Sequence, residues 1–79
     1  VVAKAELDDC VEGWVADILR CAPLAVRATK EAVMKGLDTT LAEAFEQAYE
    51  AENIRANSAD AIEGPKAFAE KRTPDWQGH

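Results

Sequence analysis

Hydrophobic side chains near the start of the chain recur with the period of an α-helix. They fall at intervals of three and four residues: Leu7, Cys10, Val11, Trp14, Val15, Ile18 and Leu19. This spacing puts them on one face of a helix, which we expect to run from about Glu6 to Cys21. Glu6, Asp8 and Asp9 occupy its first turn, where carboxylates favour the positive end of the helix dipole.

Capping signals predict two more long helices. Pro23 suits the first position of a second helix because its missing N–H is not needed there, and Gly36 can supply a left-handed cap at the end. Thr40 and Glu43 have the spacing of a capping box, which predicts a third helix reaching about Ala56. Its apolar face would contain Leu41, Ala44, Phe45, Ala48 and Tyr49.

The rest of the chain predicts only short helical turns and an extended tail. Ser58 can cap a turn through Glu63, Gly64-Pro65 should break it, and Pro65 can open another turn through Lys71. No stretch alternates apolar and polar residues as a strand does, except for the first two residues. We therefore predict an all-α fold, with residues 1–79 forming one helical segment of about three main helices plus short C-terminal turns.

Composition argues for a folded segment that needs other protein to cover it. Hydrophobic residues make up 48% of the 79 positions, which disfavours a disordered tail. Sixteen of them are alanines, which leaves few large side chains for a core of its own. The net charge of −6 opposes nucleic acid and anionic membrane surfaces, and no apolar run is long enough to span a membrane.

The cysteines and the histidine suggest neither a disulfide nor a metal site. Cys10 and Cys21 are eleven residues apart in the sequence. In one helix that separation is roughly 16 Å, too far for a disulfide. We interpret them as buried thiols of a cytoplasmic protein. His79, the single histidine, comes without the neighbours of a zinc site.

No residue of the chain is predicted to be catalytic. Glu43, Glu46 and Glu50 share one face of the predicted third helix, but a solvated polar face explains them better than a pair of acid–base carboxylates. Ser58 has no histidine base nearby and sits where helix caps sit. The acidic helical composition invites comparison with acyl carrier proteins, but the Asp-Ser-Leu that carries their phosphopantetheine is absent.

The segment from residue 58 to residue 78 is the most specific feature of the sequence. It closely resembles the C-terminal signature of the enoyl-CoA hydratase/isomerase (crotonase) family. Twelve positions match: Ser58, Asp60, Glu63, Gly64, Ala67, Phe68, Glu70, Lys71, Arg72, Pro74, Trp76 and Gly78. Pro65 departs from the pattern, and Trp76 is often phenylalanine in the family. The abrupt Val1-Val2 start and the Glu6-Leu7 pair resemble the link that follows the last strand of the family's core.

The resemblance implies the C-terminal part of a longer crotonase-like protein, without its ββα spiral core. In that family this helical region drives assembly into trimers or dimers of trimers, and the catalytic residues lie upstream. No glutamate here should inherit their role. By resemblance, Phe68 would contact the acyl or pantetheine part of an acyl-CoA substrate, and Lys71 would contact its phosphate or adenine end. The substrate is a coenzyme A thioester, and no covalently bound cofactor or metal is implied.

Several alternatives stay open at this point. For Lys71 and Arg72 the simpler interpretation is that their charges offset the helix dipole. The parent protein is expected to be an enzyme, a hydratase or isomerase, but dehydratase and thioesterase members share the signature. A helical association module without enzymatic activity is the competing hypothesis. In either case we expect self-association through faces around Leu24, Ala28 and Val33, and around Phe45 and Tyr49.

Overall fold

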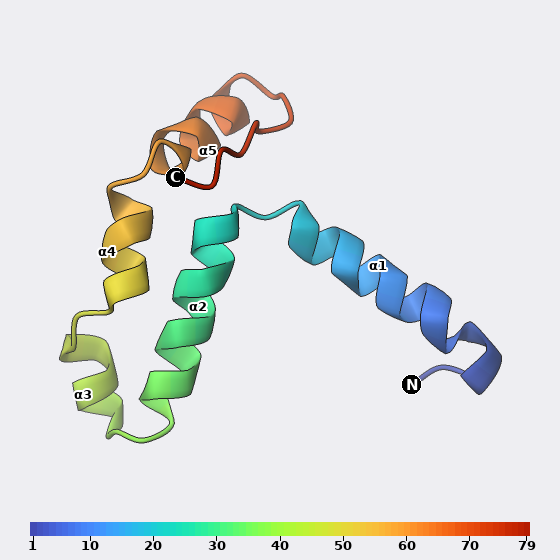
Figure 1. Ribbon diagram of the computed structural model, residues 1–79, viewed down its shortest axis with the longest axis horizontal. Coiled ribbons are helices and arrows are strands. Elements are labelled where there is room, and N and C mark those ends of the chain that lie inside the picture. The colour runs from blue at the N-terminus through green and yellow to red at the C-terminus, as the bar shows by residue number, and fades with distance from the viewer.

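The protein is helical throughout in the computed structural model, which describes residues Val1–His79 (Figure 1). A 3-10 turn, η1 (Lys4–Glu6), leads into five α-helices: α1 (Leu7–Leu19), α2 (Pro23–Gly36), α3 (Leu41–Glu46), α4 (Glu50–Ala56) and α5 (Asp60–Ala69). No strand is present, including at Val1-Val2. The all-α prediction is confirmed, with more and shorter helices than the sequence suggested.

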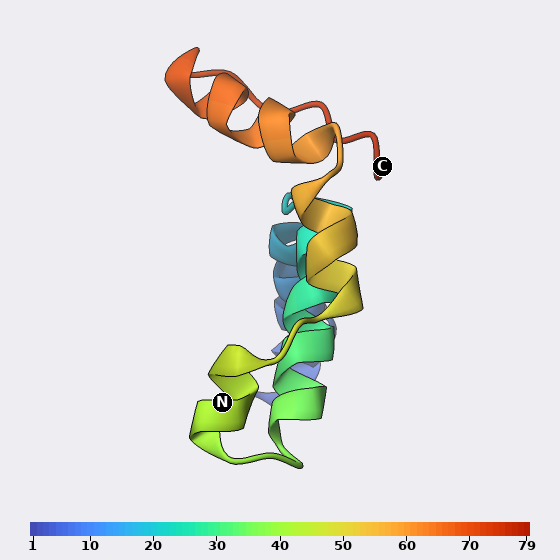
Figure 2. The same cartoon turned by 90° about the vertical axis from the view of Figure 1, so that its left-hand side faces the viewer.

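The helices form an open arrangement. Figures 1 and 2 show α4 running antiparallel beside α2, with α3 at one end of this pair and α5 crossing near the other. Helix α1 extends away from the pair after a sharp bend. The radius of gyration is 15.9 Å, whereas a compact chain of this length would have about 12 Å. The segment therefore leaves much of its helical surface uncovered.

The small interior lies where α2 meets α4. Leu24 and Ala28 are buried, and Glu31, one turn further along α2, accepts a hydrogen bond from the N–H of Ala51 in α4 (2.7 Å). This face of α2 therefore points toward α4. The prediction that Leu24 and Ala28 belong to an exposed association surface is wrong, because α4 covers them. Val33 remains 59% exposed.

The predicted third helix is interrupted, and it forms α3 and α4 instead. Gln47 and Tyr49 adopt extended backbone conformations between them. The backbone groups that lose their helical hydrogen bonds at the break are bonded to side chains. The Tyr49 hydroxyl donates to the Ala44 carbonyl (2.7 Å), and the Glu31 carboxylate accepts the Ala51 N–H (2.7 Å). The break lets α4 turn back onto α2, and it means that the acidic residues at 43, 46 and 50 do not share one helix.

The capping box at the start of α3 is confirmed. The N–H of Glu43 donates to the Thr40 hydroxyl (3.3 Å), and the N–H of Thr40 donates to the Glu43 carboxylate (3.0 Å). One member of the predicted acidic cluster therefore has a structural role, because its carboxylate satisfies a backbone donor at a helix end.

The predicted break at Gly64-Pro65 does not occur, because α5 continues through Pro65 to Ala69. Proline has a helical φ already, although it lacks the N–H that would bond the Ala61 carbonyl. Gly64 is needed for another reason. A Cβ placed on it would lie 3.3 Å from the indole ring of Trp76, so the glycine lets the tail pack closely on the helix.

The apolar face of α1 forms as predicted but is not covered by the rest of the chain. Trp14 is 70% exposed, and the residues before and after it on the same face are also largely open. Contiguous apolar surface of this kind normally marks a contact with other protein. Helix α1 thus has a core-like face without a core against it.

Candidate functional site

The candidate site lies where α5 ends and the chain turns back. Lys71 has a φ of 54°, a left-handed conformation. The N–H of Arg72 donates to the Ala67 carbonyl (3.0 Å), and that of Lys71 to the Phe68 carbonyl (3.2 Å). This is the bonding pattern of a Schellman motif, whose left-handed position is usually glycine. A side chain there costs roughly 1–2 kcal/mol, which the following contacts must offset.

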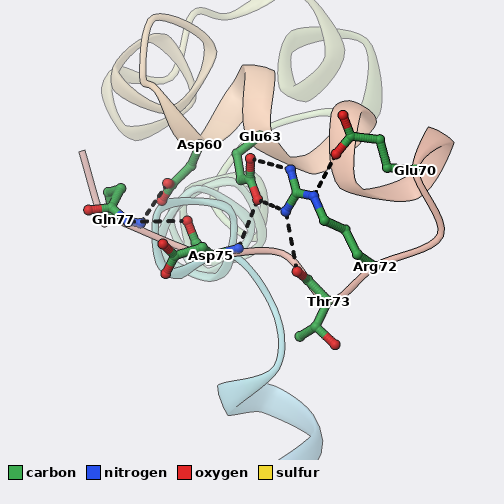
Figure 3. A network of polar contacts seen from close by, with 7 residues as sticks. All are labelled: Asp60, Glu63, Glu70, Arg72, Thr73, Asp75 and Gln77. Atoms are coloured by element: carbon green, nitrogen blue, oxygen red, sulfur yellow. Dashed lines mark hydrogen bonds and ion pairs between the residues drawn. The ribbon is translucent and has the colours of Figure 1, made fainter.

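Arg72 anchors the residues that follow the turn (Figure 3). Its guanidinium donates to the Glu63 carboxylate (2.5 and 3.0 Å), to Glu70 (2.6 Å) and to the Thr73 carbonyl (3.3 Å). Glu63 also accepts the N–H of Asp75 (2.9 Å). Figure 3 shows the guanidinium between the two carboxylates. Most of the Arg72 donors are committed to the protein, so this cation holds the tail in place.

The ion pair fixes the charge states of its members. Hydrogen bonds from Arg72, and then from the Asp75 N–H, lower the pKa of Glu63 to about 2, although partial burial opposes the shift. The carboxylates of Glu63 and Glu70 raise the pKa of Arg72 in turn. Glu63 therefore stays ionised throughout the neutral and mildly acidic range.

Asp60 holds the end of the chain. Its carboxylate is buried and accepts the backbone N–H groups of Gln77 (2.7 Å) and Gly78 (2.8 Å). The N–H of Ala59 donates to the carbonyl of His79 (2.9 Å). Residues 72–79, which we call the return segment, are thus bonded to both ends of α5. A buried carboxylate with two backbone donors is a strong structural contact.

Trp76 joins the return segment to the first part of the protein. Its indole ring lies against Gly64, and its Nε1 donates to the backbone carbonyl of Arg20 (2.9 Å). Arg20 follows the end of α1, so this bond connects α1 with α5. Trp76 therefore fixes the tail against the rest of the protein.

A groove of about 460 Å³ runs between the end of α1 and the return segment. We call it the basic groove; its lining residues are Leu19, Arg20, Lys71, Arg72, Thr73, Pro74 and Trp76. Lys71, predicted to contact the nucleotide end of a ligand, therefore lines a groove. Phe68, predicted to contact the acyl part, does not line it. Phe68 is on α5 and 87% exposed.

Sequence reasoning missed three members of this region. Arg72 was interpreted through the helix dipole alone, whereas it pairs with Glu63 nine positions earlier. That spacing belongs to no helix face, so only the fold brings the pair together. Asp60 was noted as part of the family signature without a role. No sequence pattern pointed to Arg20, because its contact with Trp76 joins positions that are 56 residues apart.

The chain contains no group of three or more His, Cys, Asp or Glu side chains arranged to hold a metal ion. Cys10 and Cys21 are free cysteines. Cys10 is half-buried and Cys21 is exposed, so the prediction of two buried thiols is wrong. None of the helices is long and apolar enough to cross a membrane.

Comparison with known proteins places the whole chain in one family. The profile of the enoyl-CoA hydratase/isomerase family matches residues 1–79. The chain belongs to the enoyl-CoA hydratase/isomerase family. The resemblance found in the C-terminal signature is therefore confirmed, and it extends over the whole chain.

Curated relatives and solved structures agree with this assignment. The chain is 38% identical to a carnitinyl-CoA dehydratase of Salmonella arizonae, matching 100% of this chain and 32% of that protein. It is 41% identical to a carnitinyl-CoA dehydratase of Escherichia coli K12, matching 99% of this chain and 31% of that protein. The chain thus spans about one third of the curated relatives that it matches.

The fold is similar to that of solved family members. An enoyl-CoA hydratase/isomerase from Mycobacterium paratuberculosis matches with a TM-score of 0.90 and 38% identity, over 99% of this chain and 31% of that one. An enoyl-CoA hydratase from Mycobacterium tuberculosis matches with a TM-score of 0.84 and 31% identity, over the same shares. The open arrangement of the helices is therefore a shape that family members adopt.

Proposed function

We propose that this chain is the C-terminal helical part of an enzyme that acts on acyl-CoA thioesters. In that enzyme it would serve in self-association and complete the acyl-CoA pocket. The observation that carries the proposal is the family match over residues 1–79, combined with an apolar helical surface that the chain itself does not cover. The oxyanion-stabilised hydration or isomerisation would take place in the part of the enzyme outside this chain.

The uncovered surfaces support the association role. One groove of about 520 Å³ runs along α2 from the end of α1, lined mainly by apolar side chains that include Ile18, Val26 and Met34. Phe45 is 84% exposed on α3. Because burial of such side chains is favourable by about 1.5–3 kcal/mol each, these surfaces favour contact with other protein. A trimer, or a dimer of trimers, is the assembly expected from the family.

Two residues at the end of α5 are the proposed substrate contacts. Phe68 presents an exposed aromatic ring, and Lys71 presents a cation that forms no ion pair within the chain. An exposed apolar ring suits the acyl or pantetheine part of the substrate, and a flexible ammonium suits a phosphate as a point charge. Their closeness in sequence would let one short segment contact both parts of a CoA thioester.

For the reaction class we propose hydration of an enoyl-CoA thioester or the reverse dehydration. Carnitinyl-CoA dehydratases and enoyl-CoA hydratases both act on coenzyme A thioesters by their names, so hydration and its reverse are the first reactions to assay. A stand-alone association module is the second candidate. The uncovered apolar face of α1 is the observation behind this second candidate, because such a face can bind a protein partner without any catalytic role.

The experiment uses the full-length protein that contains this chain. Loss of the conjugated thioester absorbance of crotonyl-CoA would report hydration, and carnitinyl-CoA would be assayed as the second substrate. We expect turnover, with Lys71→Ala raising KM more than it lowers kcat, because a phosphate contact is made about equally in the ground and transition states. Lys66→Ala is the matched control, because it removes the same charge from α5, five positions before Lys71.

The outcomes separate the two candidates. A full-length protein that turns over neither thioester and binds neither one would reject the enzymatic proposal and leave the association module. Analytical ultracentrifugation tests the association role, for which a stable monomer at high concentration would be the contradicting result.

A further inference from the structure

Helix α1 is joined to the rest of the chain by a short connection. The helix ends at Leu19 and α2 begins at Pro23, so residues 20–22 make the bend that is visible in Figure 1. None of the later helices packs extensively against α1, which projects away from them. Packing of helix on helix therefore does not fix the angle between α1 and α2, and another contact has to do so.

The remaining helices form one unit with the return segment. Helix α2 packs against α3 and α4, and α4 contacts α5. The return segment is bonded to α5 on both sides of Trp76, with Arg72 held by Glu63 and the last residues held by Asp60. The ring of Trp76 lies against Gly64 between these anchors. The indole thus has a fixed position in this unit, to which α1 contributes nothing.

One hydrogen bond crosses from this unit to α1. The Nε1–H of Trp76 donates to the carbonyl of Arg20 (2.9 Å), the capping residue at the C-terminal end of α1. Carbonyls at a helix end have no partner within the helix, so the indole caps α1 from a distant part of the chain. No ion pair joins residues 1–20 to residues 23–79, because Arg20 pairs with Asp17 on α1 itself.

We propose that residues 20–22 are a hinge and that Trp76 is its latch, so that the bond to Arg20 sets the angle between α1 and the unit formed by α2–α5. Two packed parts that move about a few connecting residues are the usual form of a hinge. A typical hydrogen bond shifts a two-state equilibrium by about fivefold. The latch therefore favours one angle and leaves a second one accessible.

The hinge angle also shapes the apolar groove along α2. Ile18 lines this groove from the end of α1 and Cys21 lines it from the connection, whereas Val26, Val33 and Met34 belong to α2. A change in the angle moves Ile18 relative to the side chains of α2. The groove therefore has its full lining only in the latched state, which links the position of the return segment to an apolar surface elsewhere on the chain.

The test is a distance measurement between two spin labels in the full-length protein that contains this chain. The labels are attached to an exposed position on α1 and one on α2 (Glu12→Cys and Arg27→Cys), in a variant without other accessible cysteines. Dilution with unlabelled protein restricts the signal to distances within one chain. The protein with Trp76 should show one predominant distance. Trp76→Phe keeps a ring against Gly64 and removes the donor, so it should raise the population of a second distance about fivefold.

Two controls separate the latch from a general loss of structure. Labels on α2 and α3 (Arg27→Cys and Glu46→Cys) both lie within the unit, so Trp76→Phe should leave the distance between them unchanged. Trp14→Phe removes the other indole of the chain, which is 70% exposed on α1. It should leave the distance between α1 and α2 as it is in the wild type.

The proposal is overturned if Trp76→Phe keeps the wild-type distances between α1 and α2, or if the distance between the labels on α2 and α3 changes to the same extent. It is also overturned if the protein with Trp76 shows no predominant distance, because the bond would then not hold the angle. None of these measurements requires turnover of a thioester, so the latch and the proposed function can fail separately.

Discussion

The indole N–H of Trp76 donates a hydrogen bond to the backbone carbonyl of Arg20, 2.9 Å away across 56 positions of sequence. It is the bond that connects the end of the chain with the end of α1. It makes the geometry of the basic groove dependent on one side chain.

Removing that bond should loosen the return segment without unfolding the helices. Trp76→Phe should lower the free energy of unfolding by about 1 kcal/mol, since a typical hydrogen bond contributes that much. Trp76→Ala should cost more, because it also removes the ring packed on Gly64. Chemical denaturation of the two variants measures the difference. A Trp76→Phe variant as stable as the wild type would show that the indole N–H contributes nothing.

Asp60 should be the most sensitive carboxylate of the chain. Asp60→Asn leaves one oxygen to accept the N–H groups of Gln77 and Gly78 and places an amide donor near the other. We expect a loss of roughly 1.5–3 kcal/mol and faster hydrogen exchange at both amides. Asp38→Asn, at an exposed position in the turn after α2, should change neither. Unchanged exchange at Gln77 would contradict the role given to Asp60.

The Glu63–Arg72 pair predicts an acid-sensitive tail. The folded-state pKa of Glu63 is about 2, below its ordinary value of 4.5. A carboxylate with a lowered pKa stabilises the fold fully above its unfolded-state pKa, and this stabilisation is lost as the pH falls from about 4.5 toward about 2. Exchange of the Asp75 amide should therefore accelerate over that window. Glu63→Gln should remove most of this pH dependence, whereas Glu12→Gln on exposed α1 should retain it.

The sequence predicted this fold where neighbours along the chain decide it. The stripe from Leu7 to Leu19, Pro23 at the start of α2 and the Thr40–Glu43 box each depend on residues within four positions, and each was correct. The break between α3 and α4 depends on Glu31 reaching Ala51, twenty positions away. Helix propensity alone favours continuity there, so tertiary capping was decisive.

In the candidate site, too, some residues could be named from the sequence and others only from the fold. Phe68 and Lys71 could be named from the signature, but their proposed ligand contacts remain predictions. The roles of Asp60, Glu63 and Arg72 became visible only when the return segment was seen to fold along α5. Gly64 is the clearest example of a residue whose role the sequence alone did not reveal. A glycine before a proline predicts a helix break, yet here the glycine lies within α5 and makes room for Trp76.

Glu31 provides a test of that tertiary cap. Its carboxylate accepts the Ala51 N–H at the start of α4 and pairs with Lys35, and these contacts lower its pKa, with the Lys35 hydrogen bond as the larger cause. Glu31→Ala should lower the free energy of unfolding and increase hydrogen exchange in α4 more than in α5, because it leaves the Ala51 N–H without its partner. Glu46→Ala on exposed α3 is the control. Equal exchange in both helices would contradict a specific cap.

Replacing Lys71 by glycine should raise stability and weaken ligand binding. Its φ of 54° suits glycine better than any residue with a Cβ. Lys71→Gly should therefore raise the free energy of unfolding by about 0.5–1 kcal/mol, after allowance for the greater freedom of glycine in the unfolded chain. Lys71→Ala keeps the strained backbone and should leave stability close to that of the wild type.

For coenzyme A thioesters the same two variants should behave alike. Both remove the ammonium, so both should raise KM by about the same factor, whereas Lys71→Arg should retain most of the affinity because it keeps the charge. Denaturation and steady-state kinetics on the three variants separate the backbone effect from the charge effect. A Lys71→Gly variant that is more stable and has an unchanged KM would show that the lysine has no part in binding. A more stable variant with a raised KM would mean that the strained cation is retained for the ligand.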